Sequence, residues 1–347
     1  MSSAPKKMPY VRLGNSGLKV SRIILGTMQY GSSDWQKWVI GDEEEAVHHI
    51  KVAYDAGINA FDTANVYSNG LSEVFLGRAI KRLQLPRDEI VVMTKLFGTV
   101  AREYGTNLLG AGSPDEIGYV NQHGLSRKHI FDSVKHSLER LQLDYIDLLQ
   151  CHRFDNETPI EETMQALHDV VKAGYVRYIG MSSCWAYQFH AMQNYAIANK
   201  LTPFISMQNH HNLVYREEER EMLPTLKLFG VGSIPWSPLA RGLLTRPLDE
   251  KTTRGGTDRM IGGYSRGAGT PTIVARVEEI AKKKGISMAQ VAVAWSLSKD
   301  GVTAPIVGTT SLKNLEELIA AVDITLTPEE IKYLEEPYQP LAVIGHS

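Results

Sequence analysis

Short apolar runs alternate with segments of helical periodicity along almost the whole chain. The apolar runs are typical of strands that are buried on both faces of a parallel sheet. Apolar residues spaced three and four apart are typical of helices that cover such a sheet. The runs lie at residues 22–28, 58–64, 90–96, 145–155, 176–184, 204–210, 232–240 and 303–310. The helical segments that follow them lie at 42–57, 72–83, 126–143, 159–174, 186–200, 216–230, 272–285 with 287–301, and 312–322.

This order of elements predicts an α/β fold, a (β/α)8 TIM barrel. Eight strand-helix units follow one another, and most are about 30 residues long, the length of one βα repeat. The helix boundaries support this prediction. Asp42 precedes three glutamates, as an N-cap would, and Gly285 follows three lysines, as a C-cap would. We therefore expect residues 1–347 to form one barrel domain.

Two of the units are longer than the others, because they contain the polar, glycine-containing stretches 97–126 and 240–270. Loops of this length in a compact barrel commonly form lids or binding loops. Each begins where a predicted strand ends, so both are expected on the C-terminal face, where barrel enzymes carry their active sites. Residues 10–21 predict an N-terminal β-hairpin that turns at 15–17. We expect this hairpin to close the opposite end of the barrel.

Composition and charge exclude several classes of protein. The net charge is -2, so the chain lacks the excess of basic residues that a general nucleic-acid-binding protein carries. No apolar stretch reaches membrane-spanning length, and the N-terminal MSSAPKKMPY lacks the apolar core of a secretory signal. Two cysteines, Cys151 and Cys184, cannot build a disulfide framework and indicate a reducing compartment. We expect a cytoplasmic protein with no nucleic-acid or membrane partner. The sequence contains no feature that indicates a particular oligomeric state.

Four polar residues stand where chemistry is expected. Asp62, Lys95 and His152 come at the ends of the second, third and fourth predicted strands, and Tyr67 lies in the loop beyond the second. Because the carboxyl ends of barrel strands meet at one rim, we expect these side chains to lie together. An ammonium beside a phenol favours the phenolate, and a carboxylate keeps the ammonium in place and charged. With a histidine that orients a carbonyl oxygen, the set can act as a general acid toward a carbonyl and as a general base toward an alcohol.

Each of these residues has a simpler interpretation on its own. Asp62 could cap a turn, and Tyr67 could pack in a loop. Lys95 could extend its stem along the surface or form a Schiff base, as in aldolases. His152 could be a buried structural histidine or one ligand of a metal site. The pairs of adjacent histidines in this chain lack the i, i+4 spacing of a helical zinc site, so no metal is predicted.

The sequence resembles the aldo-keto reductase superfamily over nearly its whole length. Its loop lengths and the motif HRFD look like the larger-loop branch, which includes fungal and bacterial oxidoreductases and potassium-channel β-subunits. The resemblance assigns the catalytic tetrad of the superfamily to Asp62, Tyr67, Lys95 and His152. The matching motifs are GTM (26–28), GINAFDTANVYSNGLSEVFLGRAI (57–80), VVMTK (91–95), LDYIDLLQCHRFD (143–155), GYVRYIGMSS (174–183), MQNHHNLVYRE (207–217), IPWSPLARGLLT (234–245) and PIVGTTSLKNLEE (305–317).

The same resemblance implies a cofactor, NADPH or NADP+, extended across the barrel rim without a Rossmann fold. No G-x-G-x-x-G follows a strand here, which agrees. The carboxamide is assigned to Ser182, Ser183 and Gln208, and the nicotinamide ring to Trp236. Without a cofactor, Ser182 and Gln208 could instead satisfy backbone groups at the strand ends. The implied cofactor-binding residues are Gly26, Thr27, Met28, Asp62, Ser182, Ser183, Gln208, Trp236, Ser237, Pro238, Leu239, Gly242, Gly308, Thr309, Ser311, Asn314 and Glu317.

The implied reaction is reversible reduction of an aldehyde or ketone, with a hydride from nicotinamide C4 and a proton from Tyr67. A regulatory NADPH-binding protein on the same scaffold is the alternative, since the tetrad can be intact there too. The substrate-facing candidates are aromatic residues just past strand ends, and they indicate an apolar or aromatic small-molecule carbonyl substrate. They are Tyr30, Trp35, Phe97 and Phe154.

Three positions depart from the superfamily pattern. Ser183 stands where asparagine is usual, and Leu318 stands where asparagine often meets the adenine. Asn314 stands where an arginine often binds the 2′-phosphate. A preference for NADPH over NADH therefore needs cations from elsewhere in the chain. The candidates are the arginines of the second long loop, Arg254, Arg259 and Arg266.

Overall fold

The chain folds around a barrel of parallel strands. The computed structural model describes residues 8–108, 110–250, 261–264 and 267–346. The barrel strands are β3 (Ile24–Gly26), β4 (Ala60–Asp62), β5 (Val91–Leu96), β6 (Ile146–Cys151), β7 (Val176–Ser182), β8 (Phe204–Gln208), β9 (Gly232–Ser233) and β10 (Ile306–Val307). They form one eight-stranded sheet in the order β10-β3-β4-β5-β6-β7-β8-β9.

The sheet closes on itself between β9 and β10. The N–H of Thr303 donates to the carbonyl of Ser233 at 2.7 Å, and the N–H of Ile306 donates to the carbonyl of Pro235 at 2.9 Å. All neighbouring strands pair in parallel. The predicted (β/α)8 barrel is therefore confirmed, and the carboxyl ends of its strands share one face.

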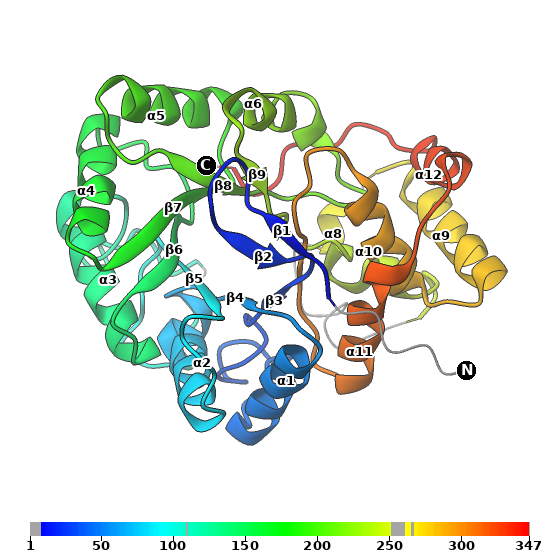
Figure 1. Ribbon diagram of the computed structural model, residues 1–347, viewed down its shortest axis with the longest axis horizontal. Helices are drawn as coiled ribbons and strands as arrows, with labels where there is room; N and C mark the ends of the chain where they lie inside the picture. Colours follow the sequence, from blue (N-terminus) through cyan, green and yellow to red (C-terminus); the bar gives the residue numbers. More distant parts are fainter. Residues whose placement is uncertain (1–7, 109, 251–260, 265–266, 347) are drawn as a thin grey trace.

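Helices surround the sheet on its outside (Figure 1). At least one helix follows each barrel strand, as the apolar spacing predicts, and α9 and α10 both follow β9. The helices are α1 (Glu43–Asp55), α2 (Leu71–Arg82), α3 (Arg127–Leu141), α4 (Ile160–Lys172), α5 (Ala186–Ala198), α6 (Met222–Phe229), α9 (Thr270–Lys284), α10 (Met288–Ser298), α11 (Leu312–Ala320) and α12 (Pro328–Glu335). Short turns of 3-10 helix are η1 (Tyr67–Gly70), η2 (Glu217–Glu219), η3 (Ala240–Thr245) and η4 (Ala321–Asp323).

The predicted helix caps are present. The Asp42 carboxylate accepts the N–H of Glu44 at 2.9 Å, so α1 begins at Glu43. Gly285 ends α9 with φ 65°, a left-handed conformation in which glycine carries no steric cost. These local signals explain why helix boundaries could be predicted from the sequence.

The N-terminal hairpin pairs β1 (Tyr10–Arg12) with β2 (Lys19–Ser21) and lies across the barrel in Figure 1. Leu13 and Val20 are fully buried, and they pack in one cluster with barrel-lining side chains such as Met93. At the turn, Gly14 has φ 58°, and a Cβ there would lie 2.5 Å from the carbonyl oxygen of Gly230. The hairpin therefore closes the end of the barrel opposite the long loops, as predicted.

The two long loops leave the carboxyl ends of β5 and β9. In the first, 97–126, the described residues contain neither helix nor strand. The second, 240–270, is only partly a loop, because it contains η3 and a helical turn, α8 (Ile261–Tyr264). Arg254, Arg259 and Arg266 lie outside the described residues. No helix in the described ranges is both long and apolar enough to cross a membrane.

The segment after α12 was not predicted as an ordered part of the fold. It runs back across the loop that follows β8. The N–H of Ile344 donates to the Tyr215 hydroxyl at 3.0 Å, and His346 lies 2.9 Å from the buried carboxylate of Glu218. Polar contacts of this kind depend on the tertiary fold, so the tail carries no local pattern that predicts them.

Candidate active site

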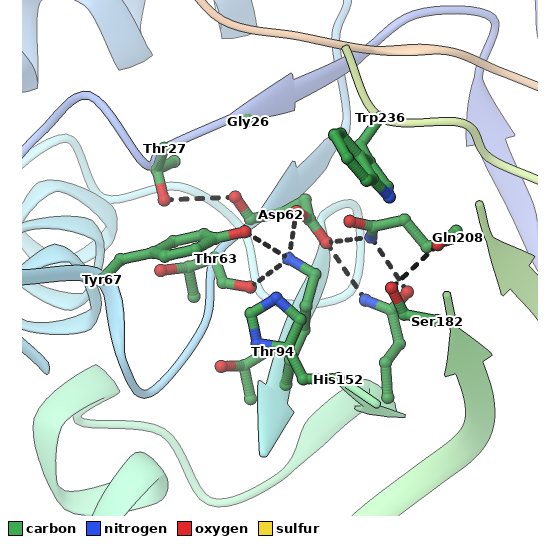
Figure 2. A network of polar contacts seen from close by, with 12 residues as sticks. Gly26, Thr27, Asp62, Thr63, Tyr67, Thr94, His152, Ser182, Gln208 and Trp236 are labelled. Carbon is green, nitrogen blue, oxygen red and sulfur yellow. Dashed lines mark hydrogen bonds and ion pairs between the residues drawn. The ribbon is translucent and has the colours of Figure 1, made fainter. Parts of the chain in front are cut away.

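The four residues of the predicted tetrad converge at the carboxyl ends of β4, β5 and β6 (Figure 2). Asp62 is the last residue of β4, Lys95 is the last but one residue of β5, and His152 directly follows β6. Tyr67 begins the turn η1, in which the next two residues have left-handed φ values of 47° and 51°. This turn brings the Tyr67 ring back over the strand ends.

Lys95 is the centre of the arrangement. Its ammonium donates to the Asp62 carboxylate at 2.6 Å, to the carbonyl of Thr63 at 2.7 Å and to the Tyr67 hydroxyl at 3.1 Å. The side chain of Lys95 is fully buried. Burial alone lowers the pKa of the ammonium, but Asp62 and Tyr67 raise it more, so the pKa lies above its ordinary value. The lysine is therefore a permanent cation beneath the phenol.

His152 faces Tyr67 edge to face, with ring centroids 5.9 Å apart. Burial, Arg153 and Lys95 lower the pKa of His152 well below its ordinary value. The imidazole is therefore neutral at neutral pH. A neutral imidazole has one N–H, which can donate to an oxygen placed between it and the Tyr67 hydroxyl.

Asp62 also binds two amide side chains. Its Oδ1 accepts from Gln150 Nε2 at 3.0 Å and from Gln208 Nε2 at 2.9 Å. In Figure 2 the carboxylate lies between Tyr67 on one side and Gln208 with Trp236 on the other. Sequence reasoning missed Gln150. Its signal was its position two residues before His152, since alternate residues of a strand face the same side.

Trp236 is fixed by a stacking contact on its ring face and by a hydrogen bond from its indole N–H. Its ring stacks on His210 at a centroid distance of 3.9 Å, and His210 stacks on Tyr215 at 4.1 Å. Its indole N–H donates to the Ser183 hydroxyl at 3.0 Å. The indole also lines a cleft, and the Arg241 guanidinium lies 5.8 Å from the ring centroid. Such a fixed aromatic surface can stack on a planar ring.

A cleft of about 870 Å³ runs across the carboxyl ends of the strands from the tetrad to the start of α11. Tyr67, His152 and Asp62 line it, so the predicted acid–base group faces open space. Most of the residues assigned to a cofactor also line it. They are Gly26, Thr27, Met28, Asp62, Ser182, Gln208, Trp236, Ser237, Pro238, Leu239, Gly242, Gly308, Thr309, Asn314 and Glu317.

Two assigned residues lie one contact away from the cleft. The Ser183 hydroxyl accepts a hydrogen bond from the Trp236 indole N–H. Ser311 is the N-cap of α11, where its hydroxyl accepts the N–H of Asn314 at 3.4 Å. Both support lining residues, and neither is itself among the residues that line the cleft.

Of the four substrate-facing candidates, the structure places one in the lining of the cleft. Trp35 lines the cleft. Tyr30 does not, because it is buried on the side of α1, where its hydroxyl lies 3.2 Å from His49 Nδ1. Phe97 and Phe154 pack against the main hydrophobic core and do not line the cleft. A position just past a strand end does not fix which way a side chain turns, and these three turn toward apolar neighbours.

Several lining residues were not predicted. Trp38 and Val66 add apolar surface near the tetrad, and Arg153, Arg241 and Arg246 add positive charge. They lie on loops or on the short turn η3, where no periodic pattern predicts orientation. Their grouping emerges only from the folded chain.

Comparisons with known proteins give the family. The sequence profile of the Aldo/keto reductase family matches residues 22–339. A Schizosaccharomyces pombe protein provisionally named an aryl-alcohol dehydrogenase is 51% identical over 99% of this chain and 99% of its own length. Versiconal hemiacetal acetate reductase from Aspergillus parasiticus is 51% identical over 97% of this chain and 98% of its own. An aldo-keto reductase from Fusarium vanettenii is 48% identical over 98% and 94%. The chain belongs to the aldo/keto reductase family.

Proposed function

We propose that this protein is an NADP-dependent oxidoreductase that reduces an aldehyde or ketone to the alcohol, in a reversible reaction. One observation carries the proposal. The buried Lys95 donates hydrogen bonds both to the Asp62 carboxylate and to the Tyr67 hydroxyl, and Tyr67 lines a cleft. A phenol beside a fixed cation can give up its proton and take it back, which general acid–base catalysis at a carbonyl requires.

The residues present fit a dinucleotide. At one end of the cleft, Gln208 offers a side-chain amide and Trp236 offers a flat surface, as a nicotinamide ring needs. At the other end, Thr309 and Asn314 lie at the N-terminus of α11, which favours a phosphate group. Arg241 and Arg246 also line the cleft and add positive charge to it. An elongated cleft with these donors supports an extended NADP(H).

Bound NADPH would supply the hydride from nicotinamide C4 to the carbonyl carbon. Tyr67 donates its hydroxyl proton to the substrate oxygen. Lys95 stabilises the phenolate that remains, and Asp62 holds Lys95 in place. Neutral His152 donates a hydrogen bond to the same oxygen and so orients the carbonyl. In the reverse direction, the Tyr67 phenolate takes the proton from an alcohol.

The cations of the cleft support NADPH rather than NADH. Asn314 carries no charge, but Arg246 directly follows η3 and lines the same cleft. A charge-assisted hydrogen bond contributes about 1.5–3 kcal/mol, so one cation on the 2′-phosphate gives roughly ten- to a hundredfold preference. We also place the protein in the cytoplasm, on the basis of its two unpaired, buried cysteines.

An aromatic or apolar carbonyl compound is the proposed substrate class. Trp35, Trp38 and Val66 bring apolar surface to the tetrad end of the cleft. The name of one relative, an aryl-alcohol dehydrogenase, points in the same direction. A bulky ring would bury more surface against these side chains than a sugar would.

The direct test is NADPH consumption with a panel of aldehydes, ketones and sugars. We expect turnover of aromatic aldehydes, with kcat/KM at least about tenfold above that for sugars of similar size. A protein that binds NADPH tightly but turns over no carbonyl compound would instead fit a regulatory role on the same scaffold.

A further inference from the structure

Gln150 is a fully buried polar residue at the site that the chemistry above does not use. It lies on β6, two residues before His152, and pairs in register with Lys95 of β5. Its side chain therefore points toward the carboxyl end of the barrel interior, among groups of the tetrad. A buried amide in such a place needs partners for both its N–H groups and its oxygen.

The partners of Gln150 form a closed triangle with Asp62 and Gln208. Gln150 Nε2 donates to Asp62 Oδ1 at 3.0 Å, Gln208 Nε2 donates to the same oxygen at 2.9 Å, and Gln208 Nε2 also donates to Gln150 Oε1 at 3.0 Å. Figure 2 marks the bond between Asp62 and Gln208 with a dashed line. The Asp62 carboxylate pairs with the Lys95 ammonium at 2.6 Å, and carboxylate oxygens only accept hydrogen bonds. Both amides must therefore present nitrogen to it.

This triangle commits both hydrogens of the Gln208 amide. One N–H goes to Asp62 and the other to Gln150. The side-chain group that Gln208 has left for the cleft is its oxygen, which accepts and does not donate. The neighbouring Ser182 hydroxyl donates to the backbone carbonyl of Gln208 at 2.8 Å, so it too offers only lone pairs to the cleft.

We propose that Gln150 is a positioning residue for nicotinamide recognition: by holding the second N–H of Gln208, it makes this end of the cleft an acceptor that selects the NH₂ of a carboxamide. The inference rests on the proposed function, because it concerns the NADP+ that the cleft would hold. It adds to cofactor binding the requirement that the nicotinamide side group carry an NH₂ donor. A nicotinamide analogue without the NH₂ has no N–H to donate to the Gln208 oxygen, and its carbonyl oxygen meets only acceptors there.

The test uses NADP+ and its 3-acetylpyridine analogue, in which a methyl group replaces the carboxamide NH₂. Dissociation constants are measured by quenching of tryptophan fluorescence, without turnover. Wild-type protein is expected to bind NADP+ about tenfold or more tightly than the analogue, the effect of one lost hydrogen bond with a buried acceptor left unpaired.

Two substitutions separate the parts of the triangle. Gln150→Met removes the acceptor, so one N–H of Gln208 becomes free to turn toward the cleft and donate to the carbonyl that both ligands share. The preference for NADP+ is expected to fall to about threefold or less. Gln150→Glu keeps an acceptor for Gln208 in either protonation state, so the preference is expected to stay near the wild-type value.

Gln193→Met is the matched control. Gln193 is also buried, but it bonds to the backbone of Phe204, away from the cleft. Its loss is expected to lower stability and leave the preference unchanged. A wild-type protein that binds both ligands equally, or a Gln150→Met variant that keeps the full preference, would overturn the inference alone. A wild-type protein that binds neither ligand would overturn the proposed function as well.

Discussion

Lys95 shows how this chain keeps a charge in its interior. The side chain is fully buried, and removing an ammonium from water costs several kcal/mol. Its three donors meet three oxygens, from Asp62, Thr63 and Tyr67. The Asp62 carboxylate at 2.6 Å offsets most of this cost, so the two side chains act as one unit.

Lys95→Met is therefore expected to lower the free energy of unfolding by about 3–5 kcal/mol, because it leaves Asp62 buried without its cation. Adding Asp62→Asn in the same chain is expected to recover at least about half of that loss. Urea denaturation of the single and double variants measures both effects. An additive loss in the double variant would show that the pair is not coupled.

Individual side chains were predictable where a strand fixes their direction. Asp62 and Lys95 lie on strands, and their convergence followed from the barrel. Gln150 shares a strand face with His152 and could have been found by the same alternation. Tyr30 could not be placed, because it follows the end of β3, where the backbone leaves the sheet and packing against His49 decides the direction.

The turn η1 and the first long loop form one element of the site. The Asn69 side chain donates to the carbonyls of Glu103, Tyr104 and Thr106 and accepts the N–H of Ala101 at 2.9 Å. It therefore fastens the loop to the turn that carries Tyr67. Asn69 has φ 51°, a conformation that asparagine tolerates better than most residues.

Asn69→Ala is expected to release residues 99–108 and to lower the free energy of unfolding by about 2–4 kcal/mol, since it removes several part-buried hydrogen bonds and strains a left-handed position. Hydrogen exchange should become faster in this segment while exchange in α4 stays unchanged. Asn69→Gly relieves the backbone strain but also lacks the bonds, so it should show the same local exchange with a smaller loss of stability. Unchanged exchange in both variants would contradict the role of Asn69.

The turn η3 brings Arg246 to the cleft, and this element carries the expected preference for NADPH. Arg246→Gln is expected to weaken NADPH binding about ten- to a hundredfold and NADH binding less than about threefold. Fluorescence titration of both cofactors measures this. Arg177→Gln is the control, because Arg177 is exposed on β7 away from the cleft. Equal losses for both cofactors would place the Arg246 contact on the part that they share.

Elements with their own local signals were predicted, and those without them were not. The helices α1 and α9 carry caps, so their boundaries could be predicted. By contrast, β9 and β10 are only two residues each, and closure of the barrel between them depends on bonds that involve Thr303 and Pro235, which lie outside those strands. The helical turns within 240–270 have no apolar periodicity of their own, so the sequence predicted a loop.

Across the whole molecule, buried histidines make stability depend on pH. Burial lowers the pKa of His49, His129, His152 and His210 below the ordinary value. These residues stay neutral in the folded chain as pH falls below about 6.5, whereas the unfolded chain takes up protons there. Their contribution is therefore complete above about pH 7 and is lost progressively at lower pH.

The free energy of unfolding is accordingly expected to fall by about 2–4 kcal/mol between pH 7 and pH 5. One histidine that takes up its proton only in the unfolded chain contributes at most about 1.4 kcal/mol per pH unit to this fall. We propose that the chain unfolds as one domain, so urea denaturation at each pH should give a single transition. His49→Gln should flatten the dependence, and the exposed neighbour His48→Gln should not. A stability that is constant or rises toward pH 5 would contradict this expectation.

The measurement that bears most directly on the proposed chemistry combines the rate of NADPH oxidation with the dissociation constant of NADPH in Tyr67→Phe. Only the phenol hydroxyl is lost, and positioned acid catalysis contributes about 10²–10⁴ in rate. We expect single-turnover oxidation of bound NADPH by an aromatic aldehyde to slow by that factor, with the dissociation constant within about twofold of the wild-type value. Tyr54→Phe, which loses a hydroxyl that donates from α1 to Glu89 in the turn before β5, should change neither. A Tyr67→Phe protein that keeps more than about a third of the wild-type rate would show that Tyr67 is not the proton donor.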